Sequence, residues 1–320
     1  MKRLLQKLGL RKRDKVSATA ARYTIRVQST VDRHRQPCLF IPAKNGGPQP
    51  LLVYLHPWRH RYDFDSTPWQ VEAAKRNWHF LAPDFRGPNR RPQACASRLA
   101  RQDVLDAVDW ACANHEVDEN RIYLGGCSGG GHMALIMAGE APDRWAAVSA
   151  WCSITDLAAF HAECRAMDAK AYRHVEKVAG GAPGSSAEVD RELRYRSPVF
   201  HMDKAAGLPV DIAHGIHDGQ PRGIGVQHSV WAFNALAKSV NGPAISDEEL
   251  ELILARNTLD LADRTDPTDR SDPSYDRPIY FRRSAGASRL TIFDGGHEDL
   301  PHAACAWFDR HPDTSGTENT

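Results

Sequence analysis

The residues of this chain best suited to covalent chemistry lie in the segment Gly126-Cys127-Ser128-Gly129-Gly130, which matches the G-x-S-x-G pattern. An apolar run before the motif predicts a strand, and small and apolar residues after it predict a helix. A serine on so sharp a turn needs glycine neighbours, because the turn forces unusual backbone angles and close packing. The alternative is a glycine-rich phosphate loop, but the lysine and the G-x-G-x-x-G spacing of such loops are missing here. We therefore interpret Ser128 as a nucleophile.

A serine hydroxyl is a poor nucleophile unless a histidine accepts its proton and a carboxylate orients that histidine. Two loops supply these groups: Asp218 follows an apolar run at 208–214, and His297 follows a run at 289–293. The order Ser128, Asp218, His297 is that of the α/β-hydrolase fold, so we predict that the three residues form a catalytic triad. The competing residues nearby are Asp211 for the acid and His132, His214 and His217 for the base.

Two hydrogen-bond donors must also stabilise the negative oxygen of the intermediate. The backbone N–H of Gly129, the residue after the nucleophile, supplies one. The second is expected in the loop after the strand at 51–55. Pro57 has no N–H, so we predict the backbone of Trp58, with Arg59 or a side chain as alternatives. The candidate substrate-binding residues adjoin these groups and are Trp58, Arg59 and Cys127.

The elements that must position these residues alternate along the chain. Continuous apolar runs are typical of strands buried on both faces of a parallel sheet. Such runs lie at 51–55, 79–82, 145–152, 208–214 and 289–293. Helical spacing of apolar residues between the runs, and an alternating pattern from Tyr23, predict covering helices and an antiparallel opening pair of strands. We therefore predict the α/β-hydrolase fold, with a mainly parallel eight-stranded sheet and helices on both faces.

We expect one catalytic domain at 23–311 with two insertions near the active site, at about 155–205 and 241–287, where the alternation stops. The first insertion is a candidate cap over the site. Residues 1–22 are expected to form a basic tail, whose alternative is a weak membrane-surface or targeting helix. Residues 312–320 are expected to be a disordered tail.

Composition argues against several other classes of protein. The 41 lysine and arginine residues balance 40 aspartate and glutamate residues, so we expect no nucleic-acid partner. No stretch is long enough for a transmembrane span, and the basic N-terminal residues lack the apolar run of a secretory signal. The seven cysteines form no C-x-x-C pair, and no cysteine-histidine spacing indicates zinc. We expect a cytoplasmic protein without metal or cofactor, of unknown oligomeric state.

Two further sets of charged residues have a weaker functional interpretation. The aspartates at 263–276 could bind Ca²⁺, but the loop lacks the glycine and terminal glutamate of an EF-hand, so a solvated loop is expected. Four arginines could bind a substrate carboxylate through paired hydrogen bonds, or could form surface salt bridges instead. They are Arg59, Arg86, Arg282 and Arg283.

Several segments together resemble serine hydrolases of the prolyl oligopeptidase family, which are α/β hydrolases, over roughly residues 23–310. The segments are Pro83-Asp-Phe-Arg-Gly87, Asp103-Val-Leu-Asp-Ala-Val-Asp-Trp110, Val117-Asp-Glu-Asn-Arg-Ile-Tyr-Leu124, the Gly126 to Gly130 turn, His214-Gly-Ile-His-Asp218 and Gly295-Gly-His297. The resemblance implies the same triad of Ser128, Asp218 and His297 that the residues themselves predict. Esterases that act on acetylated sugars have similar catalytic domains.

The chain departs from the pattern of this family in two respects. Family oligopeptidases usually place a large β-propeller before the hydrolase domain, whereas about twenty residues precede the first predicted strand here, which argues against peptidase activity. The glycine-rich oxyanion loop of the family is replaced by Pro57-Trp58. The indole of Trp58 could select small acyl groups or stack on a sugar, or it could be buried and structural.

We therefore expect a cofactor-free hydrolase of carboxylic esters with short acyl groups, whose substrate is a small-molecule or saccharide ester. Its rate should fall as His297 becomes protonated near the ordinary histidine pKa of about 6.5. A small aminopeptidase or acylaminoacyl hydrolase is the alternative among serine hydrolases. A catalytically silent hydrolase fold that serves as a binding module is the alternative from another class.

Overall fold

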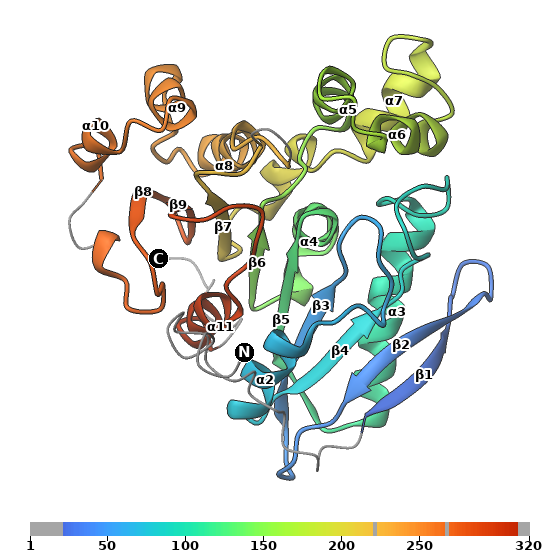
Figure 1. Ribbon diagram of the computed structural model, residues 1–320. Helices are drawn as coiled ribbons and strands as arrows, with labels where there is room; N and C mark the ends of the chain where they lie inside the picture. The colour runs from blue at the N-terminus through green and yellow to red at the C-terminus, as the bar shows by residue number, and fades with distance from the viewer. Residues whose placement is uncertain (1–21, 220–222, 266–268, 313–320) are drawn as a thin grey trace, which may run out of the picture.

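A nine-stranded sheet runs through the centre of the protein in the order β1-β2-β4-β3-β5-β6-β7-β9-β8 (Figure 1). Neighbours from β4 to β9 pair in parallel, whereas β2 is antiparallel to both of its neighbours and β8 is antiparallel to β9. The strands are β1 (Tyr23–Gln28), β2 (Arg35–Ile41), β3 (Gln49–Leu55), β4 (His79–Pro83), β5 (Val117–Cys127), β6 (Ala147–Trp151), β7 (Val210–Gly215), β8 (Ile279–Ala285) and β9 (Ser288–Phe293). This arrangement confirms the predicted fold class and the antiparallel opening pair.

The computed structural model describes residues 22–219, 223–265 and 269–312. The predicted tails at 1–22 and 312–320 therefore lie outside the described residues, apart from one residue of each.

The sheet has one strand more than predicted, because β8 lies inside the segment at 241–287 that the sequence pattern marks as an insertion. A tight turn at Gly286, with φ of 57°, joins β8 to β9. The strand pattern is hidden in the sequence because a charged residue takes a buried position. Arg282 is 5% exposed and pairs with Asp272 at 3.1 Å, so its charge is compensated inside the protein.

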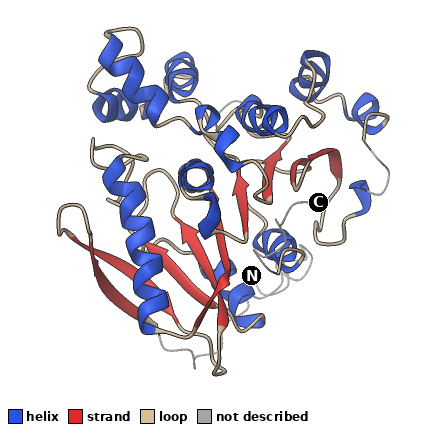
Figure 2. Ribbon diagram, turned by 180° about the vertical axis from the view of Figure 1, so that it is seen from behind, coloured by secondary structure: helices blue, strands red, loops and turns tan. Residues whose placement is uncertain are grey.

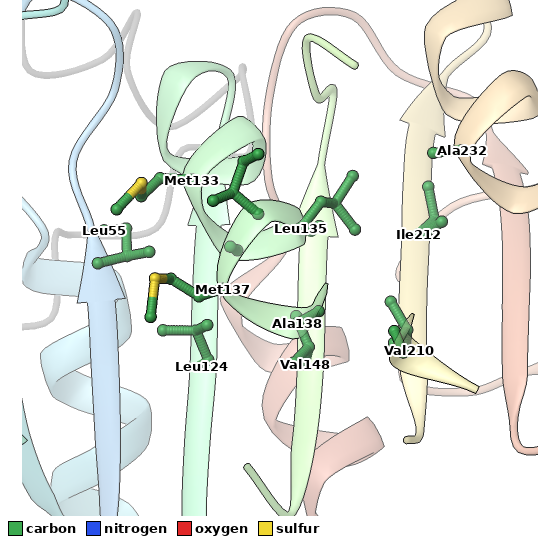
Figure 3. Packing of buried hydrophobic residues seen from close by; sticks show 14 of the residues in the cluster. Leu55, Leu124, Met133, Leu135, Met137, Ala138, Val148, Val210, Ile212 and Ala232 are labelled. Carbon is green, nitrogen blue, oxygen red and sulfur yellow. The ribbon is translucent and has the colours of Figure 1, made fainter. Parts of the chain in front are cut away.

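Helices cover both faces of the sheet (Figure 2). Three pack on one face, and two pack on the other against a cluster rich in aromatic side chains. The first three are α3 (Arg98–Asn114), α4 (Gly129–Glu140) and α8 (Gln227–Ser239), and the other two are α2 (Thr67–Lys75) and α11 (Pro301–Asp309). Figure 3 shows Met133 and Met137 of α4 packed beside Leu55 and Leu124 of the sheet. This packing fixes α4, and with it the turn that carries the candidate nucleophile.

The two segments predicted as insertions contribute helices beyond the edge of the sheet at which β3, β5, β6 and β7 end (Figure 1). Between β6 and β7 lie α5 (Leu157–Ala166), α6 (Ala171–Ala179) and α7 (Ala187–Tyr195), and between α8 and β8 lie α9 (Asp247–Leu254) and α10 (Thr258–Ala262). Within the described ranges, no helix has the length and apolar character needed to cross a membrane.

Candidate active site

Ser128 occupies a strained turn between β5 and α4, with φ of 59° and ψ of −119°. The turn is tight because glycines meet other backbone atoms closely. A Cβ on Gly126 would lie 2.6 Å from the carbonyl carbon of Gly130, and one on Gly130 would overlap the carbonyl oxygen of Leu55. The N–H of Ser128 donates to the carbonyl of Trp151 at 2.8 Å. Such a strand–turn–helix context is that of a nucleophile elbow.

The predicted acid and base meet at the ends of β7 and β9. Nδ1 of His297 lies 2.7 Å from Oδ2 of Asp218. The other carboxylate oxygen of Asp218 accepts the backbone N–H groups of Gly219 at 2.7 Å and Ile224 at 3.1 Å. Burial raises the pKa of Asp218, but the hydrogen bonds from His214 and His297 outweigh burial and lower it well below the usual range. Asp218 is therefore a fixed negative charge that holds His297 in one orientation.

The environment of His297 favours its protonated form. Burial lowers the pKa of His297, but the hydrogen bond with Asp218 and the contact with Cys152 outweigh burial and raise it to about 10. A general base must be neutral to accept a proton. The fall in rate on acidification should therefore begin at a pH above the ordinary histidine pKa of about 6.5, which the sequence alone predicts.

Cys152 is a neighbour of the site that the sequence did not single out. Its Sγ lies 3.6 Å from the carbonyl oxygen of Gly296 and 3.4 Å from that of Glu298, the two residues that flank His297. The preceding residue, Trp151, accepts the N–H of Ser128. The end of β6 therefore anchors both the nucleophile turn and the base loop. No feature of the sequence around Cys152 distinguishes it from an ordinary buried cysteine.

The three alternative candidates for the base make other contacts. His132 is fully buried, Nε2 lies 2.8 Å from the carbonyl of Arg196, and burial lowers the pKa of the ring to about 4. His217 is exposed and pairs with Asp294 at 3.0 Å. His214 is buried behind Asp218, where its Nε2 lies 3.3 Å from the carboxylate. His214 thus contacts the predicted acid, Asp218, on the buried side.

The alternative acid, Asp211, points into the sheet. Its carboxylate accepts hydrogen bonds from Arg289 at 2.7 Å and from Ser149 at 2.9 Å, and it is fully buried. This network satisfies the charge inside the protein. Asp211 therefore has a structural role, away from His297.

The predicted oxyanion donors lie side by side. A Cβ on Gly129 would stand 2.5 Å from both the backbone nitrogen and the Cα of Trp58. Gly129 begins α4, so its N–H has no partner within the helix. The ring of His56 fixes the other loop, since its two nitrogens lie 3.0 Å from the carbonyl oxygens of Pro57 and Asp84. The backbone of Trp58 thus packs directly against that of Gly129.

The side chains of two predicted substrate-binding residues are packed into the protein. The indole of Trp58 is 6% exposed, packs edge-on against Phe160 of α5, and donates to Nδ1 of His174 at 3.2 Å. Little of its face is left for a sugar to stack on, so the structural interpretation fits this indole better. Cys127 is 7% exposed within the aromatic cluster on the α2 side of the sheet.

Three of the four candidate arginines are bound to carboxylates. Arg86 makes paired hydrogen bonds to Asp103 at 2.7 and 2.9 Å. Arg282 pairs with Asp272, and Arg283 pairs with Glu249. Arg59, in contrast, is exposed beside Trp58.

One cluster near the triad has the residue types of a metal site. Cys152, His214 and Asp218 each place a possible ligand atom within 4.8 Å of the others. Nε2 of His214, however, lies 3.0 Å from the carbonyl oxygen of Ile224, which can only accept, so this nitrogen carries the proton and has no free lone pair. The cluster therefore fits a hydrogen-bond network around Asp218 better than a bound ion.

A cavity of about 250 Å³ adjoins the acid loop. Its wall includes Asp218, Glu163 and Met167 at the end of α5, and Ile253 and Leu254 of α9. Both predicted insertions therefore contribute to a space that reaches a member of the predicted triad.

The chain resembles proteins named as peptidases, in sequence or in fold. The uncharacterized peptidase YtmA of Bacillus subtilis (strain 168) is 27% identical over 161 residues, which make up 50% of this chain and 58% of that protein. The acylaminoacyl peptidase of Pyrococcus horikoshii matches with a TM-score of 0.64 and 14% identity, over 100% of this chain and 45% of that chain. A puromycin-hydrolyzing peptidase of Mycobacterium tuberculosis matches with a TM-score of 0.61 and 15% identity, over 97% of this chain and 41% of that chain.

The chain thus spans little more than half of its curated relative and less than half of either solved structure. Because these identities are low, the match to the solved structures shows a shared fold only. The family assignment comes instead from a sequence model that matches residues 65–245, which is more than half of the chain. The chain belongs to the prolyl oligopeptidase family.

Proposed function

We propose that this serine hydrolase of the prolyl oligopeptidase family cleaves carboxylic esters with short acyl groups. The observation that carries the proposal is the pairing of a nucleophile elbow with an acid–base couple at the same edge of the sheet. Ser128 has the strained elbow angles, and His297 lies 2.7 Å from Asp218. The anchoring of both loops at the end of β6 supports their joint action.

In the proposed reaction, Oγ of Ser128 attacks the ester carbonyl while His297 accepts its proton. Asp218 keeps the imidazole oriented and stabilises its positive charge. The N–H groups of Gly129 and Trp58 stabilise the negative oxygen. The protonated His297 then gives its proton to the departing alcohol, and water activated by His297 hydrolyses the acyl group from Ser128.

A small serine peptidase is the second candidate, and one observation favours it. The similar proteins described above are peptidases by name. The insertions at 155–205 and 241–287 would then select among acyl and leaving groups.

The test compares p-nitrophenyl esters from acetate to octanoate with aminoacyl p-nitroanilides. We expect ester turnover that declines with acyl length, and a loss of about 10⁴-fold or more in Ser128→Ala. Turnover of anilides without an ester preference would favour the peptidase instead. A fluorophosphonate probe should label the wild type and the control Ser185→Ala, whose serine is exposed, but not Ser128→Ala. A folded wild type that resists the probe would indicate a silent binding protein.

A further inference from the structure

Basic side chains from three segments gather around Trp58, next to the predicted oxyanion donors. The indole of Trp58 donates to His174 of α6 at 3.2 Å, and the carbonyl of Trp58 accepts the N–H of Asn89 at 2.8 Å. Arg59 directly follows Trp58, and Arg90 directly follows Asn89. The two hydrogen bonds therefore bring both arginines and His174 into one neighbourhood.

The two arginines of this neighbourhood carry charges that no described ion pair compensates. Arg59 and Arg90 are both exposed, and within the described part of the chain neither guanidinium forms an ion pair. Two of the carboxylates on the same segments are occupied by other partners. Asp84, before Arg90 in the chain, is bound by Arg61 at 3.1 Å, and Glu176 of α6 is bound by a histidine at 3.0 Å. Two cationic groups that can each donate in pairs are thus available to an anion.

His174 adds a neutral donor near the two arginines. The indole nitrogen of Trp58 can only donate, so Nδ1 of His174 must accept, and the ring proton resides on Nε2. Burial lowers the pKa of His174, and the charges of Arg59 and Arg90 lower it further. The ring therefore stays neutral with an N–H at Nε2, for which the described residues provide no acceptor.

We propose that Arg59, Arg90 and His174, here termed the basic rim, bind a carboxylate of the substrate. The rim adjoins the backbone N–H of Trp58, which lies beside Gly129 and the nucleophile. A carboxylate held there would lie close to the bond that is cleaved. The inference rests on the proposed function and narrows its substrates to acyl compounds that carry an anionic group near the scissile bond.

The test uses two pairs of esters, in each of which only one member carries a carboxylate. Mono-p-nitrophenyl succinate against p-nitrophenyl butyrate places the carboxylate on the acyl side, and 3-acetoxybenzoate against phenyl acetate places it on the leaving side. We expect the wild type to prefer the anionic member of one pair. Arg59→Gln and Arg90→Gln should each lower kcat/KM for that ester by about tenfold, chiefly through KM, because each removes a charge-assisted hydrogen bond.

The matched control is Arg173→Gln, which removes the same charge from an exposed residue of α6 whose guanidinium contacts Tyr172. The control should keep the preference and should hydrolyse the neutral esters like the wild type. Equal rates for both members of both pairs, or a preference that survives Arg59→Gln and Arg90→Gln, would overturn the basic rim.

Failure of the proposed function would look different, because then no ester of either pair would turn over. In that case, monomethyl succinate would be tested for protection of Ser128 against the fluorophosphonate. Protection of the wild type that is lost in Arg59→Gln would support the basic rim. Equal labelling with and without monomethyl succinate would overturn it.

Discussion

The substitution Asp218→Asn tests the site most directly, because the structure dictates how the new amide must lie. One carboxylate oxygen accepts the N–H groups of Gly219 and Ile224. Since an amide nitrogen cannot accept, the amide oxygen must take that place. The NH₂ group then faces Nδ1 of His297, which has to accept a hydrogen bond where it previously donated one.

This reversal puts the ring proton of His297 on the nitrogen that should accept the proton of Ser128. The wrong tautomer costs about 10⁴-fold in kcat in other Ser-His-Asp hydrolases, and we expect a similar loss here. The NH₂ group would also face Nε2–H of His214, 3.3 Å from the present carboxylate oxygen. Two donors that face each other inside the protein should lower the free energy of unfolding by about 1–3 kcal/mol.

The assay is kcat/KM for p-nitrophenyl acetate from about pH 5 to about pH 10, with urea unfolding in parallel. Asp294→Asn is the matched control, because Asp294 also pairs with a histidine, at 3.0 Å, but its side chain is 39% exposed. The control should stay within about twofold of the wild type, as expected for an exposed pair. If folded Asp218→Asn retained a tenth of the wild-type activity, Asp218 would not be the acid of a triad.

Two further predictions concern the base and the elbow. His297 must be neutral to act, so activity should rise with pH through its raised pKa. The midpoint of the pH profile should lie above about pH 6.5 for the wild type. Cys152→Ala should move this midpoint to lower pH, because Cys152 helps to raise the pKa of His297. A midpoint that does not move in the pH profile of kcat/KM would remove Cys152 from this role. Gly130→Ala should lower the free energy of unfolding in urea by about 1–3 kcal/mol or more, because its methyl group overlaps the backbone of Leu55. The control Gly46→Ala, with no atom near the added methyl group, should change it by about 0.5 kcal/mol or less; equal effects in the two variants would contradict the packing argument.

The parts of the site that could be predicted from the sequence are those that depend on local pattern. A G-x-S-x-G between an apolar run and a helix specifies its own turn, whatever lies around it. Asp218 and His297 follow apolar runs, and parallel strands end at one edge of a sheet, so the distance between them in the chain did not matter. The pairing of these two side chains in the structure follows from that rule.

The parts that could not be predicted depend on contacts between distant segments. Cys152 lies by His297 because β6 and the loop after β9 meet in space, and no residue type indicates that contact. The partner of the Trp58 indole, His174, comes from a helix whose placement no periodicity specifies. The strand β8 is not recognisable from the sequence, because it has a charged residue, Arg282, at a buried position. The ion pair with Asp272 compensates that charge inside the protein.

The separation between sheet and insertions has a consequence for how this protein can evolve. The residues of the predicted triad lie on turns that follow β5, β7 and β9. The helices α5–α7 lie in the chain between β6 and β7, and α9 and α10 lie between α8 and β8. Mutations in those helices can therefore reshape the cavity beside Asp218 while the nucleophile turn keeps its strained angles. Substrate preference can therefore change in evolution while the predicted catalytic residues keep their positions. Exchange of the segment at 155–205 between members of the family would follow the same route in the laboratory.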